Sequence, residues 1–143
     1  MRQQLLTTRE DFDYWVFDMD DALERFLTGL PIKVRESLNF SPSSLNILET
    51  WILDKYPNTQ AMLETDQSRV VDGAARYIGE TFRHAIGGYW DIQLDDPKQA
   101  FAGVPILTGC EKQSTPICPL ALATTSADRR TGRFLCTVLE NQM

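Results

Sequence analysis

The stretch YIGETFRHAIGGYW, residues 77–90, decides the fold because a helix ends, the chain turns and a strand begins within it. Upstream of the turn, apolar residues recur at helical spacing, which predicts a helix from about Asp66 to Ile86. Gly87-Gly88 supplies the glycine expected just past a helix C-terminus. Downstream, apolar and polar side chains alternate over residues 89–94, which predicts a half-buried strand.

Gly79 lies inside this predicted helix, where a glycine costs about 1 kcal/mol relative to alanine. It shares a stripe of small residues with Val71 and Ala75, so we expect another backbone to approach the helix closely there. The opposite face is expected to be solvated, with Asp72 and Arg76 spaced for an ion pair. The polar residues expected on that face are Arg69, Asp72, Arg76, Glu80 and Arg83.

Two further helices are predicted before this one. The first spans residues 7–27, where Thr7 and Glu10 have the spacing of a capping box and Gly29 follows the last turn. The second begins after Ser41-Pro42, a pair suited to the N-cap and the first helical position, and ends at Pro57-Asn58. The apolar face of the first helix consists of Phe12, Trp15, Val16, Met19, Ala22, Leu23, Phe26 and Leu27.

The C-terminal half combines short strands with short helices. A second strand is predicted over residues 101–107 and a third, shorter one at Ile117-Cys118. Residues 119–141 favour short helices that begin at Pro119, although their β-branched residues also permit a strand. The predicted fold is α+β, a single domain over residues 1–143. In it, N-terminal helices pack on a small antiparallel sheet of about three strands, and short helices follow at the C-terminus.

Composition and charge narrow the classes of protein. The chain has 143 residues, enough to bury a core, and its formal net charge of −6 disfavours binding to nucleic acid or to anionic membranes. Cys110, Cys118 and Cys136 lack the spacing of a zinc site, so we expect reduced thiols, no metal and no cofactor. Because no apolar stretch suits a signal peptide or a membrane span, we expect a soluble cytoplasmic protein.

The sequence VFDMDDAL, residues 16–23, is similar to the D-x-D motif of haloacid-dehalogenase-type phosphatases. That resemblance implies Asp18 as the nucleophile and Asp20 as the acid–base residue, with Mg²⁺ bound beside them. In those enzymes the motif follows a strand, whereas residues 7–27 have helical periodicity, and no Gly-Thr comes after the second aspartate. We therefore interpret the segment as a solvated acidic helix face.

The histidine and the tryptophans are the other candidates for chemistry. Glu80 lies one helical turn before His84, the chain's one histidine, so its carboxylate can orient the imidazole. No local motif places a nucleophile near His84, and a histidine at a helix end also benefits from the C-terminal dipole. Trp15, Trp51 and Trp90 can line a ligand pocket, but each lies on the apolar face of its own element, which favours a core role.

One part of the chain has a family resemblance. The run Ala75-x-Tyr77-Ile78-Gly79-Glu80, then Gly87-Gly88-x-Trp90 and the prolines at 116 and 119, resembles small uncharacterised bacterial α+β domains. The similarity covers roughly residues 66–140. It implies helices packed on a small antiparallel sheet and brings no catalytic residues with it. Some bacterial domains of this general build are immunity or accessory proteins, which is an analogy at the level of the fold.

The first functional hypothesis is a non-catalytic cytoplasmic module, of immunity or accessory type, that binds another protein. Its motivation is the acidic charge together with the lack of a convincing catalytic constellation. Acidic side chains on the first helix attract a basic partner and raise its rate of association. The residues expected to do so are Asp11, Asp18, Asp21 and Glu24.

The alternative hypothesis belongs to a different class, a small-molecule-binding or hydrolytic protein. Its cleft is expected between the helix over residues 66–86 and the sheet. The ligand would contact Glu80, His84 and Trp90, which meet where that helix gives way to the strand.

Overall fold

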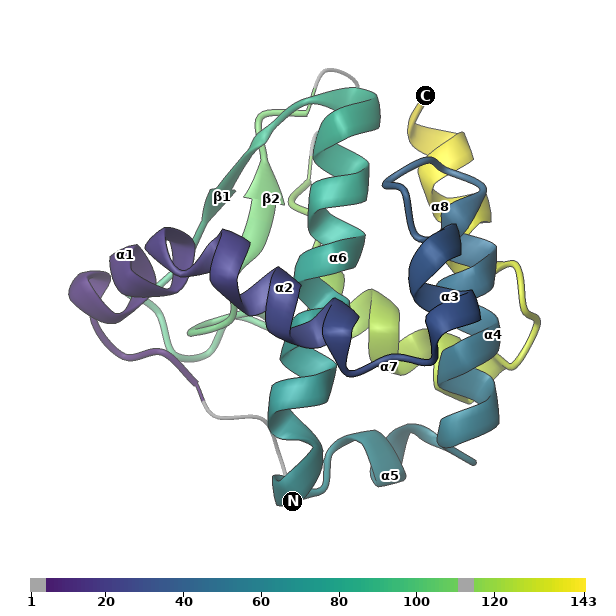
Figure 1. Cartoon of the computed structure of the whole chain (residues 1–143). Helices are drawn as coiled ribbons and strands as arrows, with labels where there is room; N and C mark the ends of the chain where they lie inside the picture. Colours follow the sequence, from purple (N-terminus) through teal and green to yellow (C-terminus); the bar gives the residue numbers. More distant parts are fainter. Residues whose placement is uncertain (1–4, 111–114) are drawn as a thin grey trace.

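The computed structural model describes residues 5–110 and 115–143, and their arrangement confirms the predicted α+β class (Figure 1). These residues form eight α-helices, a 3₁₀ helix over Thr65–Gln67 and a two-stranded antiparallel sheet of β1 (Tyr89–Asp91) and β2 (Ile106–Thr108). The α-helices are α1 (Arg9–Phe17), α2 (Met19–Thr28), α3 (Ile32–Ser37), α4 (Ser44–Lys55), α5 (Thr59–Met62), α6 (Ser68–Ile86), α7 (Pro119–Arg129) and α8 (Phe134–Gln142).

Helix α6 runs through the centre of the molecule and confirms the helix predicted over residues 66–86. It contacts α2, α4, α7 and α8, and the middle of its apolar stripe, Ala74, Ile78 and Phe82, is fully buried. The crossing with α2 is as close as a glycine allows, because a Cβ atom on Gly73 would lie 2.6 Å from the Phe26 ring. The helices therefore pack mainly around α6, whereas we expected the N-terminal ones to pack on the sheet.

The single helix expected over residues 7–27 is two helices, α1 and α2, which meet at Asp18. Asp18 has φ −79° and ψ 3°, outside the helical region, and its carboxylate accepts a hydrogen bond from Arg25 Nη2 at 2.8 Å. The break turns Val16 out to solvent, so its predicted core position was wrong. The N-cap is Thr8 in place of Thr7, and its hydroxyl accepts from the Asp11 N–H at 3.0 Å.

Arg76 is buried, only 3% exposed, although its sequence position predicted a solvated face. The predicted ion pair with Asp72 forms, with 2.7 Å between Arg76 Nε and Asp72 Oδ2. The guanidinium also lies 4.0 Å from the centre of the Trp15 ring and donates to the Trp15 carbonyl at 2.8 Å. Trp15 Nε1 in turn donates to the other Asp72 oxygen at 2.9 Å. This network links α1 to α6. The Arg76 charge can be buried because Trp15, a partner far away in the sequence, accepts its hydrogen bond.

The sheet is smaller than the three strands we expected. Strands β1 and β2 pair over three residues each, and Ile117 adds only an isolated bridge to Leu107. Prolines before and after these segments lack the N–H that a ladder needs (Pro105, Pro116 and Pro119). Glycines with positive φ bend the chain at the same places (Gly88, Gly103 and Gly109). The expected strands over residues 89–94 and 101–107 are therefore cut to three residues each.

The C-terminal segment is helical, as favoured, and α7 begins at Pro119 as predicted. Helix α8 is joined to α4 by Glu49, a fully buried carboxylate. Its oxygens accept hydrogen bonds from the N–H groups of Phe134 (3.1 Å) and Leu135 (2.8 Å). They satisfy two of the free donors at the start of α8. Among the described residues, no helix is long and apolar enough to cross a membrane.

Tyr56 makes the stability of the fold sensitive to alkaline pH. Burial, with a further contribution from Asp66, raises the pKa of Tyr56 from 10.0 to about 12. In the unfolded chain the phenol ionises near its ordinary pKa of about 10, so the free energy of unfolding falls as the pH rises from 10 to 12. We expect Tyr56 to account for a loss on the order of 2 kcal/mol, so the decline in Tyr56→Phe should be smaller by about that amount. Tyr77, whose pKa burial also raises, still contributes in both proteins. Urea unfolding of both proteins across this pH range measures the difference, and parallel curves would contradict it.

Candidate functional site

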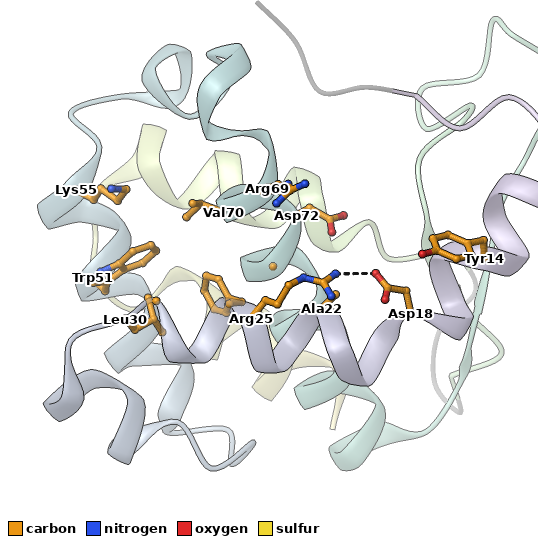
Figure 2. A pocket seen from close by; sticks show the side chains of 13 residues that line it. Tyr14, Asp18, Ala22, Arg25, Leu30, Trp51, Lys55, Arg69, Val70 and Asp72 are labelled. Carbon is orange, nitrogen blue, oxygen red and sulfur yellow. Dashed lines mark hydrogen bonds and ion pairs between the residues drawn. The ribbon is translucent and has the colours of Figure 1, made fainter.

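A groove of about 690 Å³ opens between α2, α4 and α6 (Figure 2). We call it the α2–α4–α6 groove. Trp51 and Lys55 lie at one end, Tyr14 lies at the other, and Arg25 with its ion pair to Asp18 runs along one side. The lining residues are Tyr14, Asp18, Ala22, Arg25, Phe26, Gly29, Leu30, Trp51, Lys55, Arg69, Val70, Asp72 and Gly73.

The apolar part of the groove is built by residues that the core holds in place. Phe26 is buried and meets Trp51 edge-on at 5.9 Å between ring centres. Trp51 is half-buried, so one side of its indole packs on the core while the rest faces the groove. Leu30 and Val70 complete the wall. The close crossing of α2 and α6 fixes these side chains, because both helices are locked against each other.

Three cationic side chains from three different helices line the same groove. Arg25 on α2 is paired with Asp18, and that hydrogen bond raises the pKa of Arg25. Lys55 on α4 lies 5.9 Å from the centre of the Trp51 ring, and Arg69 on α6 is exposed. Neither Lys55 nor Arg69 has an ion pair within residues 5–110 and 115–143.

The two carboxylates of the groove are already occupied. Asp18 holds Arg25, and Asp72 binds Arg76 and Trp15. The groove therefore presents a surplus of positive charge, although the whole chain has a formal net charge of −6. Such a surplus attracts an anion, and the aromatic wall next to it suits an apolar group of the same ligand.

The groove offers binding groups and no recognisable catalytic machinery. Its one hydroxyl belongs to Tyr14, and no histidine or cysteine lines it. The three thiols lie elsewhere, buried, and burial raises the pKa of each, which keeps them unreactive. Within the part of the chain that the structure describes, no group of three or more His, Cys, Asp or Glu residues is placed to hold a metal ion.

Glu80, His84 and Trp90, the residues predicted to contact a ligand, do lie close to one another. Trp90 Nε1 donates to Glu80 Oε2 at 2.7 Å, and the same carboxylate binds Arg83 Nη1 at 2.9 Å. His84 Nδ1 lies 2.6 Å from the Glu80 carbonyl oxygen, and its ring stacks on Phe40 at 5.4 Å. Glu80 and His84 line neither the α2–α4–α6 groove nor the cavity described next, so a ligand at this place stays a prediction.

A second, much smaller cavity lies where the alternative cleft was expected, between α6 and the segment around the sheet. It holds about 70 Å³ and is lined by Trp90, Trp15 and Ala75 among others. Trp15 and Trp90 meet edge-on at 4.8 Å between ring centres. Both rings line this space, whose volume suits a few water molecules at most.

The predicted partner-binding residues differ in their exposure. Asp11, Asp21 and Glu24 are exposed, whereas Asp18 is half-buried and bound to Arg25. Asp18 lies at the junction of α1 and α2 and Asp20 lies in α2, and residues 5–17 contain no strand of the kind that precedes the motif in haloacid-dehalogenase-type phosphatases. Asp18 thus serves the groove by fixing Arg25.

The groove itself was missed at the level of the sequence. The sequence suggests Trp51 as a possible pocket residue and Arg69 as a solvated residue. No pattern in the sequence places either of them near Arg25 or Lys55. One local signal was available, the spacing of Trp51 and Lys55 by four residues, which places both on one side of α4. The relative placement of the three helices depends on tertiary packing, which no local pattern contains.

Comparison with known proteins adds no relative. No family model matches the chain, and no curated protein or solved structure matches it significantly.

Proposed function

We propose that the chain is a non-catalytic binding protein whose α2–α4–α6 groove takes a small anionic ligand with an aromatic or apolar part. The observation that carries the proposal is the meeting of Arg25, Lys55 and Arg69, from three helices, beside the Trp51 wall. In a chain with 20 acidic and 14 basic residues, such a local excess of cations is a distinct feature of the surface.

The dimensions and chemistry of the groove support this class of ligand. Its volume of about 690 Å³ falls within the range of about 300–1,000 Å³ common for small-molecule sites. An acidic group on the ligand binds Arg69 and Lys55, which have no carboxylate partner of their own among the described residues. The apolar part stacks on Trp51, where an aromatic face and a nearby Lys55 ammonium are already in place.

The ion pair between Asp18 and Arg25 gives the groove its selectivity. Arg25 is held at 2.8 Å by Asp18, so its guanidinium is oriented before a ligand arrives. The Asp18 carboxylate also repels a second acidic group on its side of the groove, which favours a ligand whose charge lies at Lys55 and Arg69. The proposal thus keeps the small-molecule-binding class that the sequence suggested. It moves the site from the C-terminal end of α6, near Glu80 and His84, to the N-terminal half of that helix, and it includes no hydrolytic step.

A binding experiment with simple aromatic acids tests this function. We expect phenyl phosphate and benzoate to change the tryptophan fluorescence, whereas the neutral benzyl alcohol does not. Arg69→Gln should weaken phenyl phosphate binding by about 10- to 100-fold, as expected for loss of a charged hydrogen bond worth about 1.5–3 kcal/mol. Titrations of the parent protein and of Arg69→Gln with phenyl phosphate, followed by fluorescence and by calorimetry, give the two dissociation constants.

Arg129→Gln is the matched control for Arg69→Gln. Arg129 is an exposed arginine at the end of α7, stacked on Phe134 at 5.2 Å and outside the groove. Its loss removes the same charge from the whole protein but should leave binding unchanged. Equal weakening in both variants would show that anion binding depends on the net charge of the protein and not on Arg69. If none of the anions bound, the proposed function would lose its support.

A further inference from the structure

Helix α1 presents an aromatic and acidic surface that the fold leaves uncovered. Phe12 is buried and Trp15 is half-buried, so this side of α1 packs inward. On the opposite side Tyr14 is 67% exposed and Phe17 is 85% exposed. We call the surface formed by Glu10, Asp13, Tyr14 and Phe17 the α1 face. These residues follow the i, i+3, i+4, i+7 spacing of one helix side.

The α1 face is held rigidly and is accessible. The buried Arg76 binds the Trp15 carbonyl and stacks on the Trp15 ring, which fixes the orientation of α1. Figure 1 shows α1 at the margin of the molecule, away from α4 and α8. Adjacent exposed aromatic residues on a rigid helix favour an interface, since aromatic side chains are enriched at the centre of interfaces. A partner that binds here loses little freedom in the protein itself.

The charges around the aromatic pair decide which partner fits. Glu10 and Asp13 share the face, and Asp20 and Asp21 follow in the first turn of α2, all exposed. A second copy of the chain that docks by the same face would bring these like charges together, which is unfavourable. An acidic surface attracts lysine and arginine instead and accelerates their association.

We propose that the α1 face binds a basic segment of another protein, in which lysine or arginine side chains flank an apolar residue. The apolar residue packs on Tyr14 and Phe17, and the cations pair with Glu10 and Asp13 from the same side. This inference does not rest on the α2–α4–α6 groove: the two surfaces share Tyr14, but Phe17 and both acids lie outside the groove's lining. The proposal also changes the acidic partner-binding surface predicted from the sequence. The surface now centres on Tyr14 and Phe17, and Asp18 is not part of it because it is paired with Arg25.

The probe is a designed amphipathic helical peptide with leucine and lysine on one side, compared with the same peptide carrying glutamate for lysine. We expect the lysine peptide to shift backbone NMR resonances of residues 9–21 and its affinity to fall with added salt. The glutamate peptide should not bind. Phe17→Ser should weaken binding at least about tenfold, which corresponds to about 1.4 kcal/mol.

Ile32→Ser is the matched control, since Ile32 is another exposed apolar side chain, 60% exposed, on α3. It should bind the lysine peptide like the parent protein. Arg69→Gln should also bind it normally, which separates this result from a failure of the groove. No binding of the lysine peptide, or shifts centred outside residues 9–21, would overturn the proposal. So would a concentration-dependent dimer in sedimentation that is lost in Phe17→Ser, because it would identify a second copy as the occupant.

Discussion

Glu49→Ala is expected to lower the free energy of unfolding by about 3–4 kcal/mol. Glu49 is fully buried, and no lysine or arginine pairs with it among the described residues. Its charge is balanced instead by the N–H groups of Phe134 and Leu135 at the positive end of α8. Alanine leaves the buried Leu135 N–H and the part-buried Phe134 N–H without a partner and opens a cavity between α4 and α8.

Two comparisons isolate the role of the carboxylate. Glu49→Gln keeps the shape and one acceptor oxygen but places an amide N–H₂ against a helix N–H, so we expect about half of the alanine effect. Glu24→Ala removes an exposed glutamate from α2 and should change stability by less than about 0.5 kcal/mol. Urea unfolding with an unchanged m-value measures all three. A loss below about 1 kcal/mol for Glu49→Ala would show that water replaces the carboxylate.

The contrast between Glu49 and the helix that carries it shows what the sequence predicted and what it did not. Leu45, Leu48 and Ile52 form a periodic stripe, and their burial on α4 follows from that stripe alone. Glu49 lies next to the stripe and looks like a surface residue. Its burial depends on the start of α8, 85 residues further along the chain, which no local pattern contains. Arg76 was misplaced for the same reason, because its partner Trp15 is 61 residues away.

The short strands and the groove fall outside local prediction for related reasons. Of residues 89–94, Ile92 alone is buried and only Tyr89–Asp91 form a strand, because pairing requires a second strand of equal length. Pro105 and Gly109 limit that second strand to Ile106–Thr108. In the same way, Arg25, Lys55 and Arg69 each look like an ordinary surface cation. The crossing of α2 over α6, set by the contact of Gly73 with Phe26, and the packing of Trp51 of α4 on Phe26 bring them to one groove.

Gly79 in α6 contacts a side chain and not the backbone that its stripe of small residues suggested. A Cβ atom there would overlap Cη2 and Cζ2 of the Trp90 indole and lie 3.2 Å from Pro119 Cγ. The indole has little room to move, because it donates to Glu80 and meets Trp15 edge-on. Trp90 of β1 therefore packs onto α6 at Gly79. This contact joins the helical part of the fold to the sheet.

Gly79→Leu is accordingly expected to cost more than about 3 kcal/mol of unfolding free energy, above the usual range for added core volume. Gly79→Ala should also destabilise, by about 1–2 kcal/mol, since the overlap exceeds the gain of about 1 kcal/mol in helix propensity. Gly29→Ala is the control: a Cβ there lies 3.5 Å from its nearest neighbour and φ is −82°, so stability should hold or rise.

Trp90→Phe decides whether the indole is the cause of the Gly79 effect. Phenylalanine lacks the outer ring atoms that a Cβ at Gly79 would overlap, although it also loses the hydrogen bond to Glu80. In a double-mutant cycle, Gly79→Ala should cost much less in the Trp90→Phe background than in the parent, with a coupling energy of about 1 kcal/mol or more. Additive losses would instead place the obstacle at Pro119 or in the helix backbone. If Gly79→Ala stabilised the parent, Trp90 would have to be free to swing away from α6, and the sheet would not be anchored to the helix through this ring.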